Sequence, residues 1–199
     1  MSNLVTLTNS SKHRCMFAPL MILLLMASPL IVQAEAKPEN SKPQKKSEWF
    51  SEQGGFSIKL VPVNRDYSRA VFYARGMPAE VVEEMANYCV FGTIVKNLSA
   101  KPLSYDMSTW RAVTVDGVEH RMKLKSTWIQ EWQAKGVGFR WLLLAEAQTF
   151  EEGDWIQGFS TVKLAPAAIF DLHYSWSRGE QVFYSKLEGV TCADHQPAK

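Results

Sequence analysis

The sequence is poor in the residues and motifs from which catalytic centres are usually built. It has three cysteines and four histidines among 199 residues, and no two cysteines are spaced as Cys-x-x-Cys. It also has no Gly-x-Ser-x-Gly motif, no phosphate-binding glycine loop and no His-Glu-x-x-His motif. Each of those motifs holds a nucleophile, a phosphate or a zinc ion in a defined geometry. We therefore predict a protein that is not an enzyme.

The chain also lacks an excess of charge once its first 34 residues are set aside. The formal net charge of +2 comes from Lys12 and Arg14, because the rest of the chain has 22 − 2 = 20 basic residues against 20 acidic ones. A neutral domain has no electrostatic reason to bind nucleic acid or an anionic membrane. We predict no nucleic-acid partner.

What the N-terminus does have is the pattern of a secretory signal peptide. Lys12 and Arg14 precede an uncharged apolar run, 15–32, and Ala34 supplies a small residue for cleavage. We predict cleavage after Ala34, with Ala36 as the second choice. The alternative is an uncleaved anchor, although the run is shorter than the roughly 20 residues of a membrane-spanning helix. Both interpretations predict a periplasmic or secreted protein, with membrane contact only if the segment is retained.

Composition divides the chain into four segments. The signal peptide, 1–34, is followed by a charged, proline-containing stretch without large apolar residues, 35–48, which we predict to be a disordered leader. Residues 49–192 are long enough to form one domain with its own core. Residues 193–199 form a polar tail.

Most of the domain has the pattern of short strands separated by turn residues. We predict single strands at 56–63, 70–74, 88–95, 103–105, 139–144 and 155–164, and hairpins at 110–115 with 118–124 and at 169–176 with 181–187. Asp116-Gly117 in the first hairpin predicts a two-residue type I′ turn, in which both residues have positive φ. We predict short helices at 78–86 and 126–135, the second with Trp128 and Trp132 on one face.

Residues 90–99, followed by Pro102 and Leu103, form a strand-and-turn pattern that resembles one common in extracytoplasmic immunoglobulin-like domains. The resemblance covers about fifteen residues and implies a fold but no activity. Together with the many short strands, it predicts a mainly β protein: an immunoglobulin-like β-sandwich with one or two short helical insertions.

Two cysteines, Cys89 and Cys192, remain after signal cleavage. A pair of cysteines in an exported protein usually forms a disulfide, and this one would link a predicted central strand to the end of the domain. A redox pair or a thiolate metal ligand is the functional alternative. We predict the structural disulfide.

Aromatic residues provide the main hypothesis about function. Trp128 and Trp132 on the inserted helix, with Tyr105, are predicted to form an exposed patch, because tryptophan is enriched in binding hot spots. The alternative is that the helix covers an open edge of the sandwich and buries both indoles. A strand edge is a second possible docking surface. We predict a non-catalytic binding or accessory protein of the cell envelope, with an envelope protein or a small ligand as partner and no cofactor.

The rival hypothesis is copper binding or delivery. His120 and Met122 are two residues apart, so they share one face of a predicted strand, and imidazole with thioether suits Cu(I). Met77, Met85 and Met107 are possible additional ligands. Two placed ligands are fewer than a copper site needs.

The export hypothesis makes a direct prediction. When the full chain is produced in a bacterium with a working secretion pathway, the purified protein should begin at Glu35, because cleavage follows Ala34. N-terminal sequencing and the intact mass of the protein test this. A purified chain that retains residues 1–34 would contradict cleavage and support the anchor.

Overall fold

The computed structural model describes residues 48–138 and 142–194, which contain ten strands and three α-helices. The predicted signal peptide, residues 35–47 of the predicted leader and residues 195–199 of the tail lie outside the described residues. The protein is mainly β and every strand pairing is antiparallel, as the sequence predicts. None of the described helices is long and apolar enough to cross a membrane.

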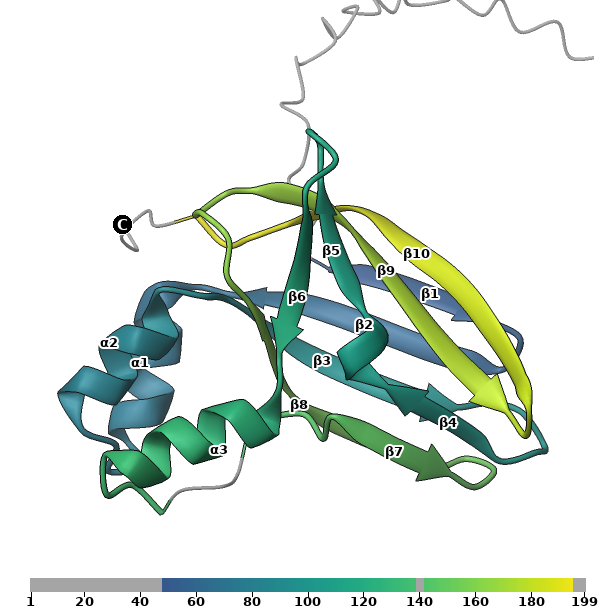
Figure 1. The fold of residues 1–199 in the computed structure, drawn as a ribbon, viewed down its shortest axis with the longest axis horizontal. Coiled ribbons are helices and arrows are strands. Elements are labelled where there is room, and N and C mark those ends of the chain that lie inside the picture. Colours follow the sequence, from purple (N-terminus) through teal and green to yellow (C-terminus); the bar gives the residue numbers. More distant parts are fainter. Residues whose placement is uncertain (1–47, 139–141, 195–199) are drawn as a thin grey trace, which may run out of the picture. The chain divides into compact units, whose positions relative to one another are not determined.

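The first sheet contains the strands β1 (Trp49–Gln53), β2 (Phe56–Val63), β3 (Cys89–Asn97) and β8 (Trp155–Val162), paired in that order. The second sheet contains β4 (Leu103–Asp106), β5 (Arg111–Thr114), β7 (Ala147–Phe150), β9 (Ile169–Arg178) and β10 (Gln181–Thr191). The strand β6 (Glu119–Lys123) pairs with β5 of the second sheet and with β8 of the first. It therefore joins the two layers along one side (Figure 1).

The β-sandwich is confirmed, but the immunoglobulin-like connection is not. β2 pairs directly with β3 over eight residues, from Phe56↔Asn97 to Val63↔Val90. In an immunoglobulin domain the second and third strands belong to opposite sheets. The short resemblance of residues 90–99 therefore identifies a strand and its turn, and not the order of the strands.

The sandwich core fills the space between the inner faces of the two sheets. Alternate side chains of each strand point inward, as the pleat requires. Large aromatic rings dominate, with the Phe56 and Trp176 rings stacked at 5.1 Å and the Trp176 and Phe183 rings at 5.4 Å. The core residues include Trp49, Phe56, Ile58, Leu60, Phe91, Val95, Leu103, Trp110, Phe150, Phe170, Leu172 and Trp176.

Both predicted hairpins are present, but the turn of the first differs from the prediction. Thr114 N–H donates to the Val118 carbonyl at 3.0 Å, and Gly117 N–H donates to the Thr114 carbonyl at 2.8 Å. The loop therefore has three residues, and among them only Gly117 has positive φ, at 83°. This is the turn-plus-bulge loop that commonly closes three-residue hairpins, so the predicted type I′ turn is wrong.

The segment 70–74, predicted as a strand, forms the end of the helix α1 (Arg65–Tyr73) and its C-cap, Ala74. The side chain of Asn64 caps this helix by accepting from Tyr67 N–H at 2.7 Å. Ser68 and Phe72, four residues apart, are buried on one face of the helix. The β-branched and aromatic residues of 70–74 favour a strand locally. The segment is nevertheless helical, because the Asn64 cap and the burial of one helix face favour a helix more strongly.

The predicted strand 139–144 is also wrong within its described part. Residues 139–141 lie outside the described residues, and Leu143 forms only an isolated parallel bridge with Phe159. Leu142 has a φ of 72°, which breaks extended geometry at that point. The backbone here passes so close to β8 that a Cβ at Gly158 would lie 2.4 Å from Leu144 N. The apolar run therefore packs against the sheet edge without forming a ladder.

The helices α2 (Ala79–Ala86) and α3 (Lys125–Ala134) confirm the two predicted helical segments. With α1 they gather at one end of the sandwich (Figure 1). They pack on the outer face of the first sheet, where Val90 of β3 joins a second apolar cluster. This helical core contains Phe72, Met77, Val81, Val82, Met85, Val90, Trp128, Trp132 and Leu143.

The predicted disulfide is present. Cys89 and Cys192 are bonded, with 103 residues of sequence separation, and both are buried. The bond attaches the end of the described chain to the start of the central strand β3.

Removing this disulfide should destabilise the domain. We expect the Cys89→Ala/Cys192→Ala variant to lose about 3 to 4 kcal/mol of unfolding free energy, because a long closed loop restricts the unfolded chain strongly. Urea denaturation of the two proteins measures the difference. A loss below about 1 kcal/mol would show that the bond adds little to stability.

Candidate functional site

The predicted aromatic patch is not on the surface. Trp128 and Trp132 are 0% exposed, and their rings lie 5.7 Å apart in the helical core. Trp128 Nε1–H donates to Thr161 Oγ1 at 2.9 Å, which attaches α3 to β8. The indoles share one helix face, as predicted, but that face covers the sheet. The predicted exposure of these two residues is therefore wrong: both indoles are buried, as in the alternative interpretation, but the helix covers the outer face of the first sheet and not an open edge of the sandwich.

Tyr105, the third member of the predicted patch, lies in the other core. Its ring is stacked against Phe150 at 5.7 Å in the sandwich, and its hydroxyl donates to the Ala145 carbonyl at 2.7 Å. Burial raises the pKa of the Tyr105 hydroxyl well above its ordinary value. The structure thus separates Tyr105 from Trp128 and Trp132 instead of bringing the three residues together.

The two predicted copper ligands lie on β6. Met122 is buried in the sandwich core, and His120 is half-buried opposite Ala112 of β5. Met77 and Met85 belong to the helical core and Met107 to the sandwich core. In residues 48–138 and 142–194, no group of three or more His, Cys, Asp or Glu side chains is placed to hold a metal ion.

The outer face of the first sheet has an unexpected character. Outward side chains form rows across the strands, and the row Val63–Val90–Thr161 lies at the end that the helices cover. Beyond the helices, nothing in the described residues covers the same face, and it carries apolar residues where a solvated sheet face is normally polar. Phe50 is 55% exposed and Trp155 is 58% exposed. We name the exposed apolar residues here the open outer face: Phe50, Val61, Ile94 and Trp155, with Tyr67 of α1 beside them.

A groove of about 480 Å³ lies where the helical cover ends. Its walls are mainly apolar, and the missing side chain of Gly92 leaves part of the space open, because the nearest atom to a Cβ there would be 3.8 Å away. Leu142, one of two described non-glycine residues with positive φ, also lines it. Strained residues of this kind are found often at ligand-binding sites. The apolar residues that line the groove are Val61, Tyr67, Ile94, Leu142 and Phe159.

A second groove, of about 670 Å³, lies between β1 and β10. Within the described residues, β1 pairs only with β2 and β10 only with β9, so this groove is bordered by two strand edges. Its lining is more polar and includes His173 and Lys186. Lys186 is already paired with Asp171 at 3.4 Å and Glu188 at 2.7 Å. The strand edges anticipated from the sequence are present, but the apolar character is concentrated in the first groove.

An ion cluster fastens the helical cover in place. Lys123, at the end of β6, is largely buried, and its Nζ lies 3.5 Å from the centroid of a Trp128 ring. The same ammonium pairs with Glu131 and, at 3.5 Å, with Glu84 of α2. Lys135 follows α3 and contacts Glu84 at 2.9 Å. Burial alone would raise the pKa of the Glu84 carboxyl, but hydrogen bonding to Lys135 and the charge of Lys123 outweigh it and lower this pKa.

The open outer face left a weak signal in the sequence. In β2 and β3, Val61 and Ile94 point to the same side as the half-buried Lys59 and the exposed Lys96, so apolar residues alternate with charged ones on this face. In β8 the alternation gives no clean apolar face. These departures from the period-two pattern indicate a covered or binding face, but they do not distinguish between the two.

Comparison with family models and with curated sequences finds no match. Among solved structures, the chain is similar to the yjhA protein from Bacillus subtilis, with 11% identity, a TM-score of 0.37 and coverage of 63% of this chain and 76% of that one. It is also similar to a DUF4426 family protein from Pseudomonas aeruginosa, with 9% identity, a TM-score of 0.37 and coverage of 74% and 98% respectively.

The ion cluster predicts a pH-dependent stability. A carboxyl whose pKa is lowered by folding stabilises the protein above its ordinary pKa, and this contribution is lost as the pH falls through the lowered folded value. We expect Glu84→Gln to cost about 1 kcal/mol at about pH 7 and close to nothing at about pH 2. Urea denaturation at both pH values measures this difference.

Glu188→Gln is the matched control, because Glu188 forms an exposed pair with Lys186 and should change stability by less than about 0.5 kcal/mol at either pH. An equal effect of Glu84→Gln at both pH values would contradict the electrostatic explanation.

Proposed function

We propose that the protein is an exported, non-catalytic binding protein of the cell envelope, and that it binds an apolar group in the groove of the open outer face. The observation that carries the proposal is this groove of about 480 Å³, bordered by exposed aromatic and aliphatic residues on a sheet face. Its volume is within the range of about 300 to 1,000 Å³ that is typical of ligand pockets.

The physical driving force is the burial of apolar surface. Exposed apolar patches on a soluble domain often mark interaction sites, and each Å² removed from water contributes about 25 cal/mol. Trp155 and Phe50 lie on the same face as the groove and extend the contact area. Trp155 is the exposed tryptophan that the described residues place on this surface, and tryptophan often dominates binding energy. An apolar side chain of an envelope protein or a small apolar ligand suits such a site.

Export is supported by two observations of different kinds. The N-terminal pattern of Lys12, Arg14 and the apolar run 15–32 is typical of a signal peptide. The disulfide between Cys89 and Cys192 suits an oxidising compartment, since structural disulfides are rare in the cytosol. The proposed partner is therefore a component of the periplasm or of the extracellular space.

The proposal is tested by filling the groove without disturbing the fold. A Cβ at Gly92 meets no clash, because its nearest neighbour would be Val61 O at the ordinary contact distance of 3.8 Å, and a β-branched residue suits a strand. We expect the wild type to bind the fluorescent dye ANS saturably through the dye's apolar aromatic rings, and Gly92→Thr to weaken that binding at least about tenfold with unchanged stability. A fluorescence titration and thermal unfolding measure the two quantities.

Gly138→Thr is the matched control, because Gly138 is exposed and a Cβ there meets nothing within 4 Å. It should bind the dye as the wild type does. If Gly92→Thr also binds the dye with wild-type affinity, the groove is not the binding site and this proposal fails.

A further inference from the structure

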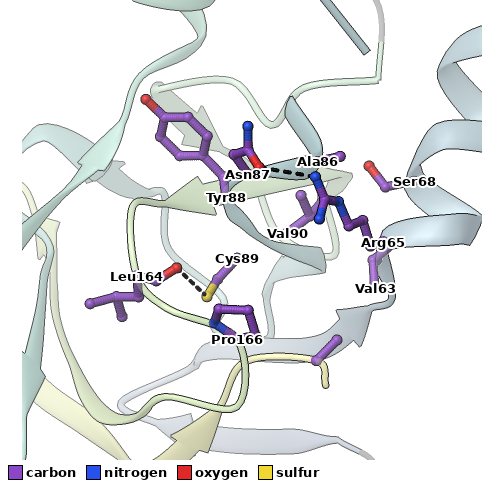
Figure 2. Close-up of a pocket in the computed structure, with 11 residues that line it drawn as sticks. Val63, Arg65, Ser68, Ala86, Asn87, Tyr88, Cys89, Val90, Leu164 and Pro166 are labelled. Atoms are coloured by element: carbon purple, nitrogen blue, oxygen red, sulfur yellow. Dashed lines mark hydrogen bonds between the residues drawn. The ribbon is translucent and has the colours of Figure 1, made fainter. Parts of the chain in front are cut away.

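A third hollow, of about 90 Å³, lies beside the disulfide. Residues from the first turns of α1, from the loop between α2 and β3 and from the segment after β8 surround it. Figure 2 shows Arg65 and Ser68 on one side, Leu164 and Pro166 on the other, and Asn87 above Arg65. Asn87 and Pro166 are exposed, so the hollow reaches the surface. It does not share a lining residue with the groove of the open outer face.

Two buried polar atoms in this pocket have no hydrogen-bond partner in the described structure. They are Ser68 Oγ and Arg65 Nε, and Ser68 is only 1% exposed. The two residues are three apart on α1 and therefore share one face of the helix. Both line the pocket. Leaving a buried polar group without a hydrogen bond is unfavourable, so two such groups in one pocket indicate a missing partner.

The chemistry of these atoms defines that partner. A guanidinium only donates hydrogen bonds, and a hydroxyl can donate one as well, so the missing group is an acceptor. Arg65 Nη2 donates to Asn87 Oδ1 at 3.1 Å. That bond leaves Nε still in need of an acceptor. The position at the first turn of α1 favours a negative acceptor, since the N-terminal end of a helix carries partial positive charge.

The neighbouring carboxylates do not satisfy Arg65. Glu83 accepts two hydrogen bonds from Arg69, at 2.8 and 2.6 Å, and its nearest approach to Arg65 is a contact of 3.6 Å with Nη2. Asp66 pairs with Arg69 at 3.3 Å. Arg69 is thus the main partner of both carboxylates, Glu83 and Asp66. Arg65 Nε therefore remains available to a ligand.

We propose that this pocket binds a carboxylate, held by Arg65 Nε–H and the Ser68 hydroxyl. Its volume of about 90 Å³ exceeds what a single water needs, so a small group such as a carboxylate can enter. The apolar side chains of Val63, Val90 and Leu164 also line the pocket and suit a short aliphatic chain attached to that group. A small organic acid is the ligand class. The site is separate from the groove of the open outer face, so the test of one proposal does not decide the other.

The test is a titration of the ¹⁵N-labelled protein with acetate, observed through the Nε–H signals of its arginines. We expect the Arg65 signal to shift saturably, while that of Arg69 stays in place because its Nε already donates to Glu83. A parallel titration with chloride separates a carboxylate site from general anion attraction. Saturable acetate binding with a chloride effect at least about tenfold weaker supports the proposal.

Two variants sharpen the result. Ser68→Ala removes one donor and should weaken acetate binding about tenfold, since hydrogen bonds to charged groups are strong. Ser126→Ala, at an exposed position of α3, is the control and should bind acetate as the wild type does. The proposal is overturned if the Arg65 signal does not respond to acetate, which would mean that only water fills the pocket. It is equally overturned if chloride acts as strongly as acetate, or if Ser68→Ala binds with wild-type affinity.

Discussion

The structure depends on the alternation of side chains along the central strand β3. Cys89, Phe91 and Val95 point into the sandwich core, while Val90 points outward into the helical core. Because the side-chain period of a strand is two, a slip of one residue would exchange the faces. The pairing of β3 with β2 and β8 is regular along its length. This regular pairing keeps Cys89 and the core residues on the inner face and Val90 on the outer face, against which the helices pack.

The three helices cover only part of the outer face of the first sheet, and the candidate site lies where this cover ends. Trp128, Thr161 and Lys123 attach α3 to the end of the first sheet, and the cover stops at the row of Val61, Gly92 and Phe159. A groove forms at this boundary because the helices end there and Gly92 has no side chain. The remaining face carries apolar residues that no helix or sheet of the described structure buries. The proposed function therefore rests on a feature of the fold, which is an outer face that the described helices cover at one end only.

Much of the fold followed from local pattern. Asp116-Gly117 between two alternating segments identified the first hairpin, and the spacing of Trp128 and Trp132 identified a helix with one apolar face. The disulfide followed from two cysteines remaining after the signal segment. The errors arose where local preference and tertiary packing disagree. Residues 70–74 have strand-forming side chains, but Asn64 caps a helix whose face is buried. Residues 142–144 are apolar enough for a strand, but the positive φ of Leu142 and the close approach to Gly158 prevent one.

The sequence by itself determined which residues are apolar, with what period they recur, and which pair of cysteines is available for a bond. Those properties are local, so they specify strands, helices and one crosslink. Only the tertiary structure decided which apolar faces are covered, because burial depends on what another part of the chain places against them. That is why Trp128 and Trp132, the predicted binding residues, are buried, whereas Phe50 and Trp155 remain exposed. The pocket of Arg65 and Ser68 was likewise invisible in the sequence, since it exists only where α1 meets the segment after β8.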